Sequence, residues 1–148
     1  MNWKDSINDF KDYLRIERGL SNNSVLSYEN DLKKLNNFLN TKREEIKPID
    51  VNSDLIKEFI YNVSKEIKSN SQSRVISGIR SFFDYLLFEG LIESNPVINI
   101  ESPKLSRKLP STLSENEINI LIKNIDKNKN ESERNIAIIE TLYGCGLR

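Results

Sequence analysis

The chain has 148 residues, of which 37% are hydrophobic and 30% charged, and its 22 basic residues balance 22 acidic ones. This composition suits a soluble helical protein that is long enough to bury a core, and the net charge of zero argues against a uniformly basic nucleic-acid binder. With no histidine, one cysteine (Cys145) and no long apolar run or secretory signal, we expect no metal site, no disulfide, no membrane contact and a cytoplasmic location.

Apolar residues at three- and four-residue steps predict four helices in the first hundred residues. We expect the first over about residues 3–18, ending at Gly19, and the second after an N-cap at Ser21. A charged connector over residues 41–52 leads to a third helix at about 53–68, and a fourth follows at about 71–89, capped within residues 70–73. The stripes expected to form the core are Trp3, Ile7, Phe10 and Leu14; Val25, Tyr28, Leu32, Leu35 and Leu39; Leu55, Phe59, Ile60, Val63 and Ile67; and Val75, Ile79, Phe82, Phe83 and Leu86.

The fourth helix carries a second face of small polar residues that is nearly free of acid. The members of this arc are Asn70, Ser71, Arg74, Ser77, Gly78 and Ser81. Solvated helix faces usually carry Glu and Lys, since Ser, Gly and Asn lower helix propensity. Small donors beside an arginine suit approach to a DNA groove, and they suit close packing against another helix equally well. Arg80, at the edge of the apolar stripe, either reaches a phosphate or lies along the surface.

The second helix has a polar face as well, and plain solvation explains it unless another feature makes it a contact surface. Its members are Asn23, Ser27, Asn30, Lys33, Lys34 and Asn37. After Asn95-Pro96, residues 97–112 are expected to form an extended linker stiffened by two prolines. Lys104, Arg107 and Lys108 fall in a stretch without acid, which either follows a phosphate backbone or is a simple tether.

Two shorter helices are expected in the last third of the chain. Ser114 and Glu117 form a capping box, and Asn130 and Glu133 repeat that pattern before a helix that ends at Gly144. The apolar faces of these helices bury little against each other, so they imply partners elsewhere. The closing segment Gly144-Cys145-Gly146-Leu147-Arg148 is either a glycine-ended helix with a basic terminus or an arginine delivered to a phosphate.

Taken in order, these segments resemble the N-terminal half of a tyrosine recombinase of the phage-integrase family, and within it the Xer type. The matching stretches are "ERGLS", "LSNNSVLSYENDLKKL" with Tyr28 and Asp31, "SRVISGIRSFFDYLLFEGLIESNPV", "SPKLSRKLPSTLSENEI" and "LYGCGLR". Val25, at a position where a small or polar residue is frequent, and the balanced charge depart from the family's pattern.

The resemblance implies an all-α fold with a SAM-like four-helix core-binding domain over residues 1–103 and a basic interdomain linker over 104–113. Residues 114–148 would be the first helices of a truncated catalytic domain. It also implies double-stranded DNA as the partner, with the second and fourth helices facing the major groove. The DNA-binding residues so implied are Arg74, Ser77, Arg80, Ser71, Asn23, Ser27, Lys34, Lys104, Arg107 and Lys108.

The family's reaction is strand exchange without a metal or nucleotide cofactor. A tyrosine attacks the scissile phosphate, a 3′-phosphotyrosyl intermediate forms, and fixed guanidinium donors stabilise the charge that develops. Arg148 matches the first of two family arginines. The family's lysine, its His-x-x-Arg pair and its nucleophilic tyrosine would lie further C-terminal, so we expect this chain to be inactive alone.

The expected function is site-specific recombination, in which full-length proteins form a tetrameric synapse and a DNA translocase is a further partner in Xer-type systems. The chain begins at the core-binding helices, which favours chromosome or plasmid dimer resolution. Two alternatives remain open at this point: a fragment of a phage or transposon integrase, and a non-enzymatic helical module whose Ser/Asn face packs on protein.

Overall fold

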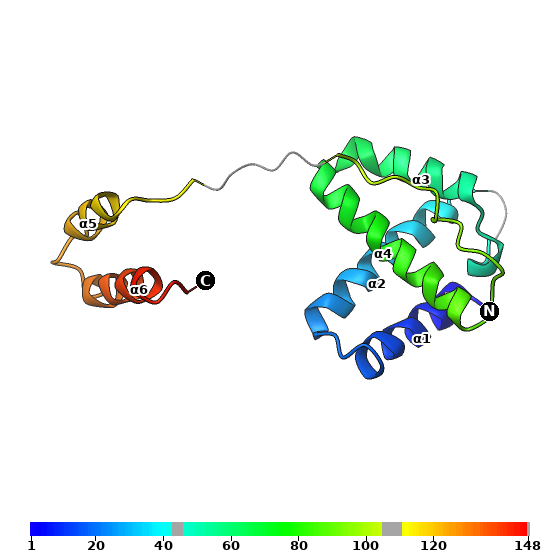
Figure 1. Ribbon diagram of the computed structural model, residues 1–148, viewed down its shortest axis with the longest axis horizontal. Helices are drawn as coiled ribbons and strands as arrows, with labels where there is room; N and C mark the ends of the chain where they lie inside the picture. Colours follow the sequence, from blue (N-terminus) through cyan, green and yellow to red (C-terminus); the bar gives the residue numbers. More distant parts are fainter. Residues whose placement is uncertain (43–45, 105–110, 148) are drawn as a thin grey trace. The chain divides into compact units, whose positions relative to one another are not determined.

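The computed structural model describes residues 1–42, 46–104 and 111–147, and within these ranges the regular structure is helical, without a strand (Figure 1). The chain divides into two compact units, Met1–Ser106 and Arg107–Arg148. The all-α prediction is therefore confirmed. The first unit holds α1 (Trp3–Ile16), α2 (Asn22–Leu39), the 3-10 helix η1 (Pro48–Asp50), α3 (Ser53–Glu66) and α4 (Ser69–Phe88), and the second holds α5 (Glu115–Lys123) and α6 (Ser132–Gly144).

Side-chain caps set the start of the first three α-helices. Ser21 Oγ accepts a hydrogen bond from the Ser24 amide at 3.3 Å, as predicted, and Asn2 and Asn52 cap α1 and α3 in the same way. Each cap satisfies amides that have no carbonyl partner within their helix. Gly19, with a φ of 59°, lies in the turn after α1, where a side chain would strain the backbone.

The boundary between α3 and α4 was predicted wrongly. The chain breaks at Ile67 and Lys68, both of which adopt extended backbone, so α4 begins at Ser69 and no side chain caps it. The segment 70–73, expected to cap the helix, instead lies within its first turns. Its serines and asparagine fit a helical backbone once the two extended residues have reversed the chain.

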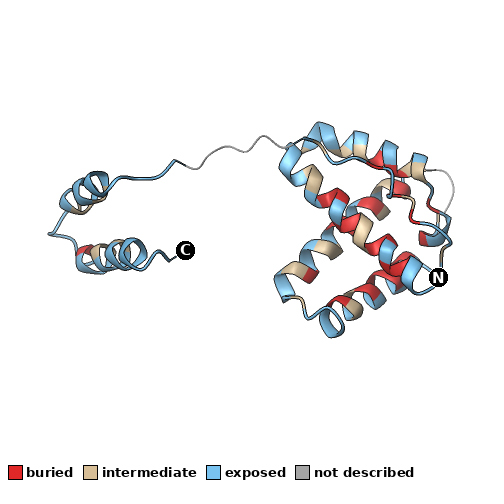
Figure 2. Cartoon of the chain, in the orientation of Figure 1, coloured by how far each residue is buried: buried red, intermediate tan, exposed pale blue. Residues whose placement is uncertain are grey.

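The core of the first unit lies where α2 packs against α1, α3 and α4 (Figure 2). Aromatic rings fill it: the centroid of Phe10 lies 5.4 Å from that of Phe82 and 5.4 Å from that of Tyr85. Trp3 stacks on Phe82 at 5.9 Å, and its indole N–H donates to the Ile46 carbonyl at 2.9 Å. The predicted stripes of α1 and α4 are buried throughout.

The stripe predicted for α3 is only partly correct. Phe59 is buried, but Leu55, Ile60, Val63 and Ile67 are half-buried. Ile56, which the prediction left out, is fully buried. The helix is therefore rotated so that the Ile56 side faces the core. Helical periodicity fixes which residues share a face, whereas the position of the face centre depends on the neighbouring helices.

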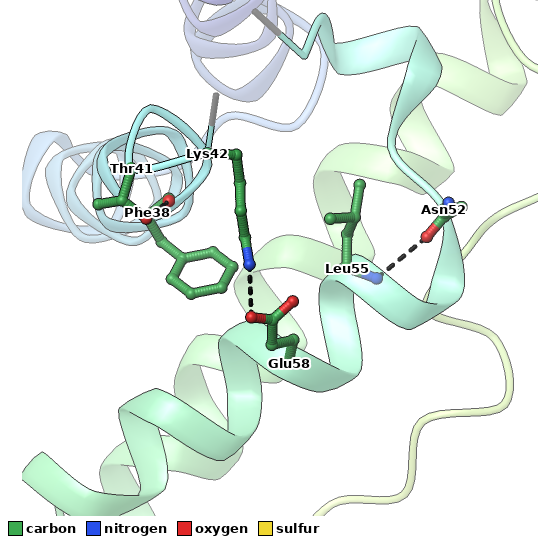
Figure 3. A network of polar contacts seen from close by, with 6 residues as sticks. All are labelled: Phe38, Thr41, Lys42, Asn52, Leu55 and Glu58. Atoms are coloured by element: carbon green, nitrogen blue, oxygen red, sulfur yellow. Dashed lines mark hydrogen bonds and ion pairs between the residues drawn. The ribbon is translucent and has the colours of Figure 1, made fainter. Parts of the chain in front are cut away.

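The corner between α2 and α3 is held by polar contacts (Figure 3). Lys42 forms an ion pair with Glu58 of α3, and its ammonium lies 5.1 Å from the centroid of the Phe38 ring. Asn52 accepts the Leu55 amide at 3.0 Å, and Thr41 donates to the Phe38 carbonyl at 2.7 Å. The Lys42–Glu58 pair joins the end of α2 to α3, while the other two contacts are local to each helix end.

The segment after α4 is not the extended linker that was expected from residue 97. Val97 and Ile100 are buried in the core, and the backbone over residues 96–99 turns. The Asn95 side chain causes this turn, since its Oδ1 accepts the Val97 amide at 2.8 Å. The first unit therefore includes these residues.

The second unit has little core of its own. The capping box of Ser114 and Glu117 is confirmed, and its hydrogen bonds lower the pKa of the Glu117 carboxyl. The expected cap at Asn130 was wrong: α6 begins at Ser132, whose hydroxyl donates to the Lys129 carbonyl at 2.6 Å. Ser132 is the buried residue of α5 and α6, and Tyr143 is half exposed.

The end of α6 lies at Gly144, as predicted. Gly144 is the last helical residue, and Gly146, with a φ of 60°, is the residue in the left-handed region. The Leu147 amide bonds the Leu142 carbonyl at 3.0 Å, as is common where a glycine terminates a helix.

The rates of amide hydrogen exchange should differ between the two units. We expect amides of α5 and α6 to exchange far faster than those of α2 and α4, because the apolar residues of the second unit are not buried. Mass spectrometry of the monomeric chain measures this. If the amides of α6 were as strongly protected from exchange as those of α4, the apolar residues of the second unit would have to be buried.

Glu29 of α2 provides a test of pH dependence. It pairs with Lys33 at 2.8 Å and with Lys11 of α1 at 2.9 Å, and hydrogen bonds from these lysines, Lys33 first, lower its pKa. A carboxyl with a lowered folded-state pKa stabilises the fold above its unfolded pKa, and this stability is lost as the pH falls through the folded-state value.

In the Glu29→Gln variant, the free energy of unfolding should therefore fall less than in the unmodified chain when the pH is lowered from neutral. We expect an effect below about 1 kcal/mol because the two lysines are partly solvated. Urea unfolding followed by the fluorescence of Trp3 measures it at neutral pH and near pH 3.5. An equal loss of stability in both proteins would contradict the role of Glu29.

Candidate nucleic-acid interface

A hollow of about 260 Å³ lies between α2 and α4. Residues with hydroxyl groups and one ion pair line it, and both helices contribute. Its lining residues are Ser24, Ser27, Tyr28 and Asp31 from α2 and Arg74, Ser77 and Gly78 from α4. The structure thus brings together the polar faces of the two helices that sequence analysis expected to meet DNA.

The ion pair of Asp31 and Arg74 forms the floor of the hollow. Arg74 Nη1 donates to Asp31 Oδ2 at 2.8 Å, and Nη2 donates to Oδ1 at 2.9 Å. The Asp31 side chain is 1% exposed, whereas that of Arg74 is 50% exposed. A buried carboxylate requires such a partner, because removal from water penalises its charged form.

Burial raises the pKa of Asp31, and the charge and hydrogen bonds of Arg74 oppose that rise. The charge of Lys34 opposes it as well, which places this lysine near the pair. Two basic residues therefore offset part of the desolvation of this carboxylate. Arg74, in turn, is held in one orientation at the surface.

Gly78 makes room for the buried carboxylate. A Cβ atom at this position would lie 2.9 Å from Asp31 Oδ2, closer than carbon and oxygen approach without displacement. Gly78 is therefore used for close packing of α4 on α2. Ser71, Arg74 and Ser77, on the same arc, are exposed, so the face packs against α2 at Gly78 and leaves its other polar side chains open to solvent.

The polar residues proposed on α2 are also at the surface. Asn23, Ser27 and Lys34 are exposed, and Ser27 lines the hollow. Lys33 is engaged by Glu29 instead. The exposed residues of α2 and α4 thus form one surface around the Asp31–Arg74 pair.

Arg80 has a different setting from Arg74. Its Nη2 donates to the Ile100 carbonyl at 2.6 Å, which ties the segment after α4 back onto the helix. The Asn95 amide adds to this tie by donating to the Arg80 carbonyl at 3.2 Å and to Asp84 Oδ1 at 2.6 Å. Arg80 is therefore a structural residue of the exit segment, and any role in DNA contact would use its other donors.

Of the remaining proposed site residues, the structure describes only Lys104. Lys104 is exposed near the end of the first unit. Arg107, Lys108 and Arg148 lie outside the described residues. In the described part of the chain, no group of three or more His, Cys, Asp or Glu side chains is arranged to hold a metal, and no helix is long and apolar enough to cross a membrane.

Sequence reasoning gave no role to Asp31 or to the Asn95 side chain. Asp31 offered a usable signal: it precedes Leu32 and follows Tyr28 by three residues, which places it at the edge of the apolar stripe of α2. An acid in that position tends to be buried only with a basic partner. The identity of that partner depended on how α4 crosses α2.

Comparisons with known proteins agree with this architecture. The family described as phage integrase, N-terminal SAM-like domain, matches residues 7–90. Proteins named tyrosine recombinase XerD are similar along nearly the whole chain. That of Oceanobacillus iheyensis is 40% identical over 147 residues, covering 97% of this chain and 48% of the relative. That of Pseudomonas putida is 36% identical over 143 residues, covering 96% and 47%.

A third relative, from Listeria innocua, is 36% identical over 145 residues and carries the same name. The matched part is 97% of this chain and 49% of that protein. The chain spans about half the length of the curated relatives it matches.

Replacing Asn95 should show that the exit segment belongs to the folded core. Asn95→Ala removes three hydrogen bonds and leaves the Val97 amide without its acceptor, so we expect a loss of about 1–3 kcal/mol. Urea unfolding followed by Trp3 fluorescence measures it. Asn99→Ala, at an exposed position of the same segment, is the matched control and should change stability by less than about 0.5 kcal/mol. Equal effects of the two would contradict the role of Asn95.

Proposed function

Because the chain belongs to the phage integrase family of tyrosine recombinases, we propose that it serves site-specific DNA recombination and that its first unit binds duplex DNA. The observation that carries this proposal is the exposed, acid-poor surface of α2 and α4 around Arg74. Seryl, asparaginyl, lysyl and arginyl side chains supply most contacts to DNA phosphates. The acid that lines the hollow, Asp31, is buried and paired, so it does not repel the backbone.

The DNA-binding residues we propose fall into two groups. Arg74, Ser77, Ser71, Asn23, Ser27 and Lys34 belong to the surface of α2 and α4. Arg80, Lys104, Arg107 and Lys108 would follow the phosphate backbone beside it. Since the net charge of the chain is zero, affinity would depend on this local distribution.

The second unit would contribute to catalysis in a longer protein. We propose residues 114–148 as the first part of a catalytic domain, with Arg148 as one guanidinium donor to the scissile phosphate. A planar guanidinium binds two phosphate oxygens and stabilises the charge that develops during attack. The nucleophilic tyrosine and the other donors would come from segments that this chain does not contain.

We propose dimer resolution of a chromosome or plasmid rather than integration of a mobile element, as the resemblance to the Xer type implies; the similar proteins carry the name tyrosine recombinase XerD. A tetrameric synapse, a DNA translocase partner and a cytoplasmic location belong to this proposal. A non-enzymatic protein-interaction module is less favoured, since the family match covers the helices that carry the polar surface.

Binding of the chain to a fluorescent 30-base-pair duplex tests the proposal. We expect binding at low salt that weakens steeply as salt rises, because phosphate contacts release counterions. Ser77→Glu places a negative charge on the surface, favours helix, and should weaken binding at least about tenfold.

Ser64→Glu on α3 is the matched control, since Ser64 is also an exposed helical serine that donates to a backbone carbonyl. It should leave the affinity within about twofold of the unmodified chain. Absence of binding at low salt would overturn the proposed function. Equal losses in the two variants would overturn the placement of the surface on α2 and α4.

A further inference from the structure

We propose that Asp31 is a positioning residue of the DNA-binding surface, which holds the guanidinium of Arg74 so that its remaining donors meet a single backbone phosphate over the α2–α4 hollow. This inference rests on the proposed function and adds to it a defined phosphate subsite. Its elements are the buried carboxylate of Asp31, the half-exposed guanidinium of Arg74 and the space that Gly78 leaves between the helices.

The hydrogen bonds leave Arg74 able to bind a second anion. A guanidinium has five N–H donors, and Asp31 takes one from Nη1 and one from Nη2. Among the described residues Asp31 is the hydrogen-bond partner of this guanidinium, so three donors remain. Two of them, Nε–H and the Nη–H beside it, share one edge and can meet a single phosphate. The Ser27 hydroxyl lines the same hollow and is exposed, which adds a neutral donor for a phosphate oxygen.

Attraction of DNA by charge alone does not account for this arrangement. The paired Asp31 cancels the charge of Arg74, and a chain without this acid would attract a phosphate more strongly at long range. A buried carboxylate costs desolvation energy, and a mid-helix glycine lowers helix propensity, yet both meet here at one point. The pair fixes the orientation of the Arg74 guanidinium, because two parallel hydrogen bonds orient a planar group.

A purely structural link between α2 and α4 would also explain a buried ion pair. The two roles predict different outcomes when Asp31 becomes neutral. Asp31→Asn raises the net charge by one, so a merely structural residue predicts equal or tighter duplex binding by the folded protein. A positioning residue predicts weaker binding despite the added positive charge, because Arg74 is no longer held in place.

The test measures duplex affinity and its salt dependence for the whole chain, well below the thermal midpoint of each variant. For Asp31→Asn we expect affinity at least about fivefold weaker and a shallower salt dependence, since one phosphate contact is lost. Asp12→Asn is the matched control, because Asp12 is an exposed acid on α1 with the same charge change. It should bind as tightly as the unmodified chain or slightly more tightly.

Arg74→Lys keeps the charge but cannot form two parallel hydrogen bonds, so it should weaken binding to a similar extent. It decides the matter if Asp31→Asn does not fold. Affinity of Asp31→Asn equal to or above that of Asp12→Asn, or unchanged affinity in Arg74→Lys, would overturn the positioning role. A chain that binds no duplex at all would instead overturn the proposed function.

Discussion

The polar surface of α2 and α4 is organised around the buried ion pair between Asp31 and Arg74. The Asp31 carboxylate is 1% exposed, and Arg74 of α4 offsets the loss of its hydration through two hydrogen bonds. The close approach also requires Gly78, since a Cβ atom there would lie 2.9 Å from Asp31 Oδ2. These requirements fix how α2 and α4 face each other, and the exposed residues around them form one surface for that reason.

A second constraint fixes the other end of the unit. The Asn95 side chain turns the backbone after α4, and Arg80 holds the Ile100 carbonyl at 2.6 Å. Val97 and Ile100 are thereby buried with the aromatic residues of α1 and α4. The two arginines of α4 that sequence analysis assigned together thus differ: Arg74 lies at the proposed DNA surface, while Arg80 secures the exit of the chain.

DNA binding by a chain of zero net charge becomes physically reasonable in this arrangement. The two acidic side chains of α2, Glu29 and Asp31, pair with lysines and with Arg74, whereas Ser27, Lys34 and Ser77 remain exposed. Phosphate binding responds to the charge within about a Debye length rather than to the total. The net charge of zero is therefore a weaker argument against DNA binding than it is when the sequence is considered alone.

The sequence by itself determined the helical class, the stripes of α1 and α4, the Ser21 cap and the capping box of Ser114, because these depend on periodicity and contacts within a few residues. It also singled out Arg74 and Ser77 from a helix face that is too small and too poor in acid for simple solvation. Only the tertiary structure decided that Ile56 faces the core, that Gly78 admits Asp31 and that Arg80 binds the exit segment. Those outcomes depend on how one helix crosses another, and that angle is set by the packing of residues more than forty positions apart, such as Asp31 and Arg74.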